Sequence, residues 1–477
     1  MSANTPRLWA VLAPTSNRLL EDVCVCRVAC KSLFKARSLQ SGTGRCWIFC
    51  FSRSRKKLLA RIRGERRSII AIIFTISFII IIIITALSFT KRCHRPHLNF
   101  RHHPTPGREM GLLSAASTQF CLDVFKEMSQ DHTTENIIFS PLSLLSTLIM
   151  VLLGARGETA TQMEKCDQDT GVHSHLQALL SEISKSSSRQ LHMASGMFAD
   201  KAHHFLPKYL DCIEQFYKLK PENIDFRNNI EEAKMQINDW VENKTKGEIK
   251  DLLSPNILTS SDQLVLVNAI SFRGIWKHSF QRDQTKSMVF RMDESQSKPV
   301  QMMRLQGHFK LGSLEEPRVQ VLEMTNAEDH LSMIIILPSE DVGLGQVTKE
   351  ITYEKLKHWI SSADMKDTAV DLHLPRLQLE EVHEDVTLIL VALGMADVFD
   401  NSLADLSGVA TGGGLVVSKI IHRARLELIE DGLESALTNQ TSEVEDPVLL
   451  KVDHPFLFLV QHRETEMILF YGRVTTP

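Results

Sequence analysis

The chain has 477 residues and a formal net charge of −3 at pH 7, enough for one large domain with an appendage or for two or three domains. The charge is unevenly divided, because residues 1–109 carry 20 Lys and Arg against 4 Asp and Glu, whereas residues 110–477 carry 34 against 53. The acidic balance of the second part argues against a nucleic-acid-binding surface there. Its cysteines, Cys121, Cys166 and Cys212, predict neither a disulfide framework nor an oxidising compartment.

Residues 1–67 show no amphipathic period and end in a basic block, so we predict a disordered extension. The spacing of Cys24, Cys26 and Cys30 matches no zinc pattern, which favours unpaired cysteines over a metal site. Residues 90–109 are expected to form a linker. Four histidines of this linker are expected to be solvated rather than to bind a metal: His94, His97, His102 and His103.

Residues 68–89 are uncharged and dominated by Ile, and as a helix they would span about 33 Å, enough for a bilayer core. They predict a transmembrane helix that is too far from Met1 to be a cleaved signal peptide. Basic residues are more numerous on its N-terminal side, a bias that keeps the N-terminus cytoplasmic and sends the large domain across the membrane. The alternative is that residues 1–109 are no part of the mature protein and that Met110 is its natural start.

The first half of residues 110–477 has mostly helical patterns. Apolar residues at helical spacing predict amphipathic helices, and residues 142–153, apolar almost all round, predict a buried helix. Ser140 stands before Pro141, a residue favoured in the first turn of a helix. The predicted helices are 114–128, 142–153, 158–165, 172–184, 231–245 and 386–393.

Strand patterns become more frequent toward the C-terminus. The continuous apolar run 331–337 predicts a central strand covered on both faces, and the alternating residues 371–380 predict one long strand. Residues 455–460 and 467–474 predict a hairpin of buried strands. Further strands are predicted at 192–198, 264–272 and 417–429. The combination predicts an α+β domain with large antiparallel sheets.

Residues 430–452 separate two strand-like segments and contain few large apolar side chains. Because a polar connection of that length inside a compact domain is usually functional, we expect an exposed loop offered to another protein. Sequence motifs of phosphate loops, dinucleotide sites, metalloproteases and serine hydrolases are absent. The carboxylates Glu380, Glu381, Glu384 and Asp385 are expected on a solvated face rather than as an acid and base pair.

Short motifs across about 365 residues follow the order found in one protein family. They are NIIFSPLS (136–143), LGARGETA (153–160), WVENKTKG (240–247), VNAISFRGIW (267–276), LHLPR (372–376), DLSG (405–408), SKIIH (418–422) and DHPFLF (453–458). With these motifs residues 110–477 resemble a serpin of the ovalbumin-like, intracellular branch (clade B). The resemblance implies an α+β fold with about nine helices and three β-sheets, a reactive-centre loop at about 430–452, and a monomer.

The resemblance also implies inhibition rather than catalysis. A serpin offers its loop to a target protease, here a serine or cysteine protease, which cleaves the loop and forms an acyl-enzyme. The cleaved loop then inserts as an extra strand into the central sheet before water can release the protease. The chain is therefore not expected to be an enzyme or to need a cofactor. Lys185 alone stands near helix 172–184, so heparin-type activation is not expected.

Four polar residues match the shutter, the region beneath the central sheet that opens for insertion: Ser140, Ser143, Asn268 and His422. Trp276 matches the aromatic residue of the breach, where the loop first enters the sheet. A purely structural interpretation, in which buried polar groups bond to one another and Trp276 is an ordinary core residue, predicts the same burial.

The loop matches the family at its first residues and departs from it afterwards. Leu433 stands where inhibitory serpins usually have threonine, and no alanine-rich run follows. Burying Asn439 on insertion costs about 1–3 kcal/mol without a partner. These departures support the alternative of a non-inhibitory serpin with a storage, binding or chaperone-type role. The hinge residues are Glu430, Asp431, Gly432, Leu433, Glu434, Ser435 and Ala436.

The scissile bond has two possible positions. Counting from the hinge places it near Asp446, before Pro447, where few proteases cleave, and counting back from Pro455 places it nearer Ser442 to Val444. The residues of this region are Ser442, Glu443, Val444, Glu445, Asp446 and Pro447.

A cytoplasmic location is favoured over two alternatives, a single-pass membrane protein with an extracellular serpin domain and a protein of the extracellular space. Asn243 and Asn439 begin glycosylation triplets, which matter only if the domain is lumenal. A glycan on Asn439 would obstruct loop insertion, so the membrane topology and inhibition are partly in conflict.

Overall fold

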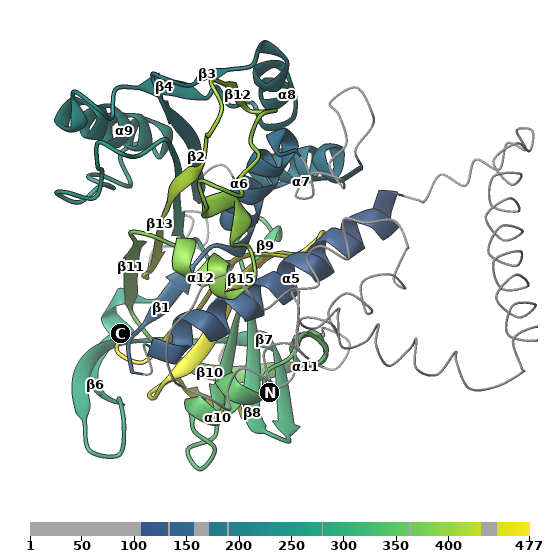
Figure 1. Ribbon diagram of the computed structural model, residues 1–477. Coiled ribbons are helices and arrows are strands. Elements are labelled where there is room, and N and C mark those ends of the chain that lie inside the picture. Colours follow the sequence, from purple (N-terminus) through teal and green to yellow (C-terminus); the bar gives the residue numbers. More distant parts are fainter. Residues whose placement is uncertain are drawn as a thin grey trace, which may run out of the picture. The chain divides into compact units, whose positions relative to one another are not determined.

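The computed structural model describes residues 106–131, 134–156, 171–187, 190–278, 280–361, 365–430 and 446–477 (Figure 1). These residues form eight α-helices and three β-sheets, in agreement with the predicted α+β class. The predictions for residues 1–105 and for a helix at 158–165 lie outside the described residues. Within the described ranges no helix is long and apolar enough to cross a membrane, and the Ile-rich segment 68–89 lies outside them.

The helices begin where the sequence offers capping groups. Helix α6 starts at Pro141, and the Ser140 side chain accepts a hydrogen bond from Ser143 N, as an N-cap serine does. The long α5 starts eight residues before the predicted helix 114–128. The described helices are α5 (Pro106–Asp131), α6 (Pro141–Gly154), α7 (Gly171–Ser187), α8 (Pro207–Tyr217), α9 (Ile230–Lys244), α10 (Leu344–Glu350), α11 (Tyr353–Trp359) and α12 (Thr387–Ala392).

The largest sheet has nine strands in the order β1-β16-β15-β9-β8-β7-β10-β14, with β6 paired to β7. The predicted C-terminal hairpin is confirmed as an antiparallel pair, and all eight residues of β9 are buried, as a strand covered on both faces requires. The strands are β1 (Ile137–Phe139), β6 (Lys286–Arg291), β7 (Ser297–Glu315), β8 (Arg318–Thr325), β9 (Leu331–Pro338), β10 (Lys366–Pro375), β14 (Val448–Lys451), β15 (Phe456–His462) and β16 (Met467–Val474).

The second sheet has five strands in the order β11-β13-β5-β2-β4, and the pair β3 (His204–Phe205) and β12 (Ala410–Thr411) forms the third. Strand β13 runs parallel to β5, whereas β11 and β2 run antiparallel to their long neighbours. The strands of the second sheet are β11 (Leu377–His383), β13 (Val417–Leu428), β5 (Leu264–Arg273), β2 (Leu191–Asp200) and β4 (Glu222–Ile224).

The single strand predicted at 371–380 is wrong, because the chain changes sheets within it. Strand β10 ends at Pro375 in the large sheet, and β11 starts at Leu377 in the second sheet. Proline donates no hydrogen bond, so it is suited to the end of a ladder. Arg376 lies at the corner, where its N–H donates to Gln301 O.

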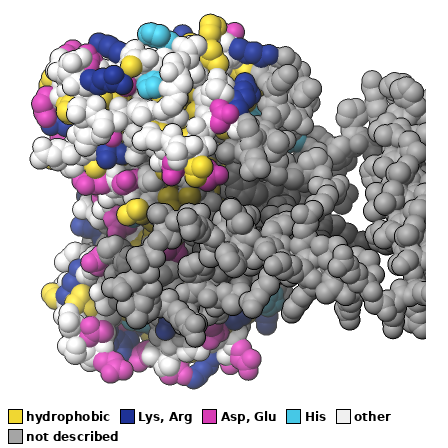
Figure 2. All heavy atoms as spheres, viewed as in Figure 1, with side chains coloured by type: hydrophobic (Ala, Val, Ile, Leu, Met, Phe, Trp, Pro, Cys, Tyr) yellow, Lys and Arg dark blue, Asp and Glu magenta, His cyan; other side chains and the backbone are white. Residues whose placement is uncertain are grey.

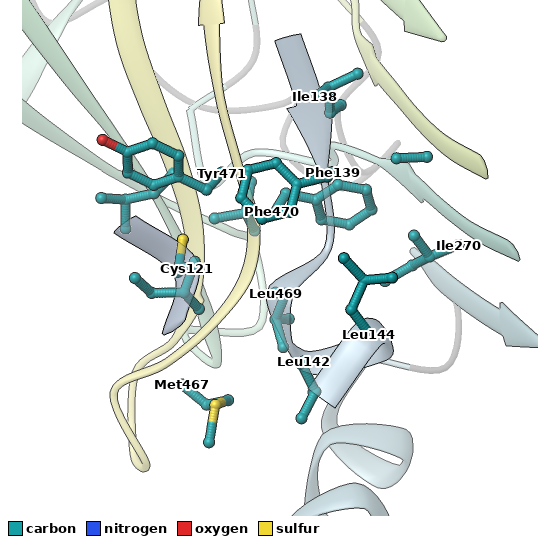
Figure 3. Close-up of a cluster of buried hydrophobic side chains, with 14 of the residues drawn as sticks. Cys121, Ile138, Phe139, Leu142, Leu144, Ile270, Met467, Leu469, Phe470 and Tyr471 are labelled. Atoms are coloured by element: carbon teal, nitrogen blue, oxygen red, sulfur yellow. The ribbon is translucent and has the colours of Figure 1, made fainter. Parts of the chain in front are cut away.

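An apolar cluster joins α5, α6 and β16 beneath the second sheet. Figure 3 shows Phe139, Phe470 and Tyr471 together with Leu142 and Leu144 from the first turn of α6 and Ile270 from β5. This packing fixes the start of α6 against the sheet, and with it the residues that precede and follow Pro141. On the coloured part of the face that Figure 2 shows, Lys and Arg side chains are mixed with Asp and Glu.

The prediction of a domain without a disulfide framework needs correction at Cys212. Cys212 on α8 is disulfide-bonded, whereas Cys121 is a free thiol buried in the core. Burial raises the pKa of the Cys121 thiol well above its ordinary value, and the nearby Asp123 carboxylate adds to the shift. Cys166 lies outside the described residues.

Candidate functional site

The centre of the candidate site is the seam between β13 and β5. The two strands pair in parallel, from Val417 with Leu264 to Glu427 with Arg273, with one register irregularity near Val417. Strand β13 ends at Leu428, and the chain is described again from Asp446, just before β14 joins the large sheet beside β10. The loop predicted at about 430–452 therefore starts at one end of this seam.

A polar cluster fills the inner side of the seam, around Asn268 on β5. The Asn268 Oδ1 accepts hydrogen bonds from the hydroxyls of Ser143 and Ser195, each at 3.0 Å, and its Nδ2 donates to Thr147 Oγ1 at 2.5 Å. The Asn268 side chain is fully buried. A buried amide costs little only when it is hydrogen-bonded, so these three hydroxyls make Asn268 tolerable in the core.

On the β13 side of the seam, the corresponding polar residue is His422. Its Nε2 accepts a hydrogen bond of 2.9 Å from the backbone N–H of Ser140, and its ring is fully buried. The ring of His383 on β11 stacks on it, with centroids 6.0 Å apart and planes 7° from parallel. Burial lowers the pKa of His422 well below its ordinary value, and the charge that His383 can carry lowers it further. His422 is therefore neutral, with Nε2 as the acceptor.

The strand registers bring these side chains into one row across the sheet. Ser195 on β2 lies opposite Asn268, and Asn268 lies beside His422. His422 in turn lies opposite His383 on β11. Four neighbouring strands thus place a polar residue at the same level, and the N-terminus of α6 supplies the groups that they bond from below.

Trp276 lies beyond the end of β5, away from this row. It is buried, forms an isolated bridge with Asn326, and packs edge-on against Phe272 with ring centroids 6.3 Å apart. Gly274 lies so close to the indole that an added Cβ would be 2.4 Å from a ring carbon, so this turn requires glycine. Trp276 is therefore held rigidly at the end of the seam where β13 finishes.

Glu430 anchors the start of the loop. It is 5% exposed, accepts a hydrogen bond of 2.7 Å from Thr285 Oγ1, and pairs with the Arg376 guanidinium. Burial by itself raises the pKa of Glu430, but the hydrogen bonds from Arg376 and Thr285 outweigh it, and the pKa lies below its ordinary value. The carboxylate thus ties the end of β13 to the corner between β10 and β11.

After Glu430, the structure describes the predicted loop only at its C-terminal end, from Asp446 onward. Asp446 has a φ of 48°, in the left-handed region that non-glycine residues rarely adopt, and Pro447 follows it before β14 begins. The predicted hinge residues Asp431, Gly432, Leu433, Glu434, Ser435 and Ala436 lie outside the described residues. The same holds for Ser442, Glu443, Val444 and Glu445 of the predicted scissile region and for Asn439.

Residues 115–477 match the family model described as "Serpin (serine protease inhibitor)". The chain belongs to the serpin family. Ovalbumin of Dromaius novaehollandiae is 41% identical over 390 residues, which is 77% of this chain and 100% of that protein. Serpin B8 of Homo sapiens is 38% identical over 374 residues, which is 76% of this chain and 99% of that protein. The predicted ovalbumin-like, clade B branch is thus confirmed.

Two solved ovalbumin structures resemble this serpin. Uncleaved ovalbumin matches with a TM-score of 0.70 and 37% identity, covering 76% of this chain and 100% of that one. A cleaved, loop-inserted ovalbumin mutant matches with a TM-score of 0.68 and 35% identity, covering 77% of this chain and 100% of that one. The β13–β5 pairing shows that the seam of this serpin is closed.

The structure brings Ser140, Ser143, Asn268 and His422 together, whereas Trp276 lies at the end of the seam. Three further members of the cluster, Thr147, Ser195 and His383, were not predicted from the sequence. Thr147 could have been predicted from helical spacing, because it lies four residues after Ser143 on the same face of α6. Ser195 and His383 depend on strand register, which the sequence does not show.

Of the four carboxylates predicted on a solvated face, Glu380, Glu384 and Asp385 are exposed, whereas Glu381 is only partly exposed. The Glu381 Oε2 accepts a hydrogen bond of 2.6 Å from Ile138 N, and His383 Nε2 lies 3.1 Å from Ile138 O. These two side chains of β11 therefore bind the backbone N–H and C=O of Ile138 in β1. Glu380 pairs with the Arg423 guanidinium on β13.

Proposed function

We propose that this serpin domain inhibits serine-type endopeptidases by cleavage and insertion of its reactive loop. The observation that carries the proposal is the parallel pairing of β13 and β5. A chain that leaves β13 and turns back at the hinge runs antiparallel to β13. Because β5 is parallel to β13, that same chain is antiparallel to β5 as well. An inserted loop would therefore replace one parallel ladder by two antiparallel ones.

Although the span from Glu430 to Pro455 is a few residues shorter than in efficient inhibitors of the family, the cleaved loop is long enough to cross the seam. The paired part of the seam covers ten residues of β5, or roughly 33 Å at about 3.3 Å per residue. Cleavage after Ser442 would leave the twelve residues from 431 to 442 attached to β13, enough to span it. The loop would thus reach past the row of polar residues at Asn268 and His422.

The proposed chemistry belongs to the protease. Its serine attacks the scissile carbonyl, the new amine terminus departs with β14, and the acyl-enzyme stays on the loop segment that follows β13. Insertion then carries the protease to the far end of the seam before water attacks the ester. The serpin is consumed in this reaction, and its role is to hold a closed seam that opens once.

In this proposal the polar cluster is the shutter, and Trp276 marks the breach. Ser140, Ser143, Asn268 and His422 hold β13 and β5 together from below until the loop arrives, and Glu430 is the pivot about which the loop turns. The buried hydrogen bonds of Asn268 and His422 support this assignment, because separating the two strands exposes or rearranges them.

A second candidate is a non-inhibitory serpin with a storage, binding or chaperone-type role. The loop sequence favours it, since Leu433 is bulky and Asn439 is polar where alternate side chains must enter a dry interior. The loop-inserted ovalbumin mutant favours the first candidate, because it shows that a similar protein can insert its cleaved loop.

A protease panel separates the two candidates. The protein is incubated with serine and cysteine proteases of trypsin-like, chymotrypsin-like, elastase-like and papain-like specificity, and the products are run on a denaturing gel. A complex that survives denaturation supports inhibition. Cleavage in the loop without a complex, and without a rise in the unfolding temperature of the nicked protein, would exclude it.

We propose a cytoplasmic location for the working domain. The family relationship with the clade B serpins supports it, the disulfide of Cys212 argues against it, and Asn243 bears on the alternative of a lumenal domain. Asn243 lies in the last turn of α9, and the hydroxyl of Thr245 in its triplet is buried and donates to Val241 O at 2.8 Å. Extraction of membranes with alkaline carbonate tests the membrane alternative, because only a protein with an inserted segment stays in the pellet.

A further inference from the structure

We propose that Arg423 and Arg425 are positioning residues that latch the β13–β5 seam from its outer side and so set how fast it opens. This inference rests on the proposed function for its biological meaning, although the latch can be measured without it. The two arginines bind the chain segment 248–251, which lies between α9 and β5.

The alternation of β13 places the two arginines opposite the shutter cluster. Ile420, Ala424 and Leu426 face the main core, and His422 between them faces the N-terminus of α6. Ile421, by contrast, belongs to the apolar cluster under α9. Arg423 and Arg425 share the face of Ile421, since strand side chains alternate with a period of two. The seam is thus held from both faces.

The hydrogen bonds of the arginines end on main-chain carbonyl oxygens. Arg423 Nη1 donates to Lys250 O at 2.6 Å and to Asp251 O at 3.1 Å. Arg425 Nη1 donates to Glu248 O at 2.7 Å and lies 3.9 Å from the Glu248 carboxylate. The Arg423 side chain is only 17% exposed. Bonds from a guanidinium are stronger than neutral hydrogen bonds and are less screened when they are partly buried.

These bonds cross the seam because of how the chain is connected. Segment 248–251 is joined to β5 through residues 252–263. Its own Ile249 and the residues that follow it, Leu252 and Leu253, pack in the same apolar cluster as Val265 and Val267 of β5. The arginines belong to β13. Arg423 is also tied to β11 through Glu380, to whose Oε1 its Nε donates at 2.8 Å.

The segment itself is fixed to α9. Leu253 N donates to Asn238 Oδ1 at 2.9 Å, and Thr245 Oγ1 accepts from Ile249 N at 3.2 Å. Lys250 Nζ pairs with Glu242 at 2.9 Å. The segment therefore cannot follow β13 without disturbing α9. When β13 moves away from β5, the arginine bonds must break.

Two consequences follow for the proposed reaction. The latch suppresses spontaneous opening, so that the intact loop stays outside the sheet. It also opposes insertion after cleavage, when speed decides whether the acyl-enzyme is trapped or hydrolysed. Weakening the latch should therefore open the seam more often and raise the trapped fraction.

Amide hydrogen exchange in the full chain tests the latch without any protease. In the double variant Arg423→Ala/Arg425→Ala we expect peptides covering 264–273 and 417–428 to exchange roughly tenfold faster, the factor that corresponds to one lost charge-assisted bond. Peptides from β15 and β16 should keep their rates. Equal acceleration throughout the protein would mean a merely structural role, and unchanged seam rates would mean no latch; either result overturns the proposal.

Two further variants make the result specific. Arg463→Ala removes a comparable guanidinium, which donates to Asp329 O at 3.3 Å and lies 3.5 Å from Glu323, and it should leave the seam rates unchanged. If the double alanine variant does not fold, the hydrogen exchange of the seam is measured instead in the double variant Arg423→Lys/Arg425→Lys. One lysine Nζ replaces a planar donor set that reaches two carbonyls and Glu380, so seam exchange should still accelerate, and unchanged rates would overturn the latch.

The latch and the proposed function can fail separately. Faster seam exchange without a stable complex from any protease would keep the latch and exclude inhibition by wild-type protein. Stable complexes together with unchanged seam exchange would keep inhibition and exclude the latch. If both hold, the alanine variant should consume fewer inhibitor molecules per protease trapped than wild type does.

Discussion

His422 and Asn268 lie side by side in the register of β13 and β5, and each binds a different part of the first two turns of α6. His422 accepts from the backbone of Ser140, and Asn268 bonds to Ser143 and Thr147. One helix N-terminus therefore holds both strands of the seam. A change on either side of this pair should alter the stability of the closed sheet.

Replacing Asn268 by alanine should destabilise the domain strongly. The Asn268→Ala variant leaves the hydroxyls of Ser143, Ser195 and Thr147 without their buried partner, and a loss of about 2–5 kcal/mol follows from a broken buried network. Urea unfolding measures it. Asn228→Ala is the matched control, because Asn228 is exposed and its side chain bonds to the partly exposed Asp225. Equal stability of the two variants would contradict the assigned network.

The neutral state of His422 should make stability depend on pH. Its pKa in the folded protein lies well below the ordinary 6.5, so the unfolded chain binds a proton that the folded state excludes. This contribution is complete above pH 6.5 and is lost as the pH falls below it, by about 1.4 kcal/mol per pH unit.

His422→Gln separates this effect from other titrating groups, because its amide oxygen can still accept from Ser140 N without binding a proton. Urea unfolding at about pH 7.5, 6.5 and 5.5 should show a steeper loss of stability for wild type than for the variant. Parallel pH profiles would mean that His422 does not supply the dependence.

The sequence predicts the elements of this fold better than it predicts their partners. Burial of the strand 331–337 and of the helix 142–153 can be predicted from their own sequences, since most of their residues are apolar. The corner at Arg376 does not, because β10 and β11 form one alternating pattern although they belong to different sheets.

The residues of the candidate site also fall into two groups, those that the sequence predicts and those that it does not. Ser140, Ser143, Asn268 and His422 are recognisable because they stand inside motifs of the family. His383, Ser195 and the pairing of Arg423 with main-chain carbonyls are set by register and by the path of a loop, and both depend on contacts far apart in the chain. Glu381 is the clearest case, because its partner, Ile138 N, lies 243 residues away in the sequence.

Removing the charge of Glu430 should weaken the anchor at the start of the loop. Glu430→Gln keeps the size of the side chain but loses the ion pair with Arg376, and we expect a loss of about 1–3 kcal/mol in unfolding free energy at neutral pH. Since the pKa of Glu430 is lowered, wild type holds this contribution above its ordinary pKa of 4.5 and loses it as the pH falls through the lower folded value.

Glu340→Gln is the matched control for that experiment. Glu340 also pairs with an arginine, Arg291, but it is 69% exposed, and exposed pairs contribute little. Chemical unfolding at neutral pH should separate the two variants clearly. If Glu430→Gln is as stable as wild type, the carboxylate is not the anchor that its contacts imply.

Leu433 should decide how well the loop inserts. It is the second residue after Asp431, and a bulky side chain there must enter the interior before the rest of the loop can follow. Overpacking costs about 1–3 kcal/mol, so Leu433→Thr should speed insertion roughly tenfold and lower the number of inhibitor molecules consumed per protease trapped.

Leu433→Met, apolar and of similar volume, is the control and should behave as wild type. The ratio of complex to cleaved product on a denaturing gel measures the effect. If the Thr variant is cleaved without any gain in complex, the bulk of Leu433 does not limit insertion, and the later loop residues, Asn439 among them, become the next positions to change.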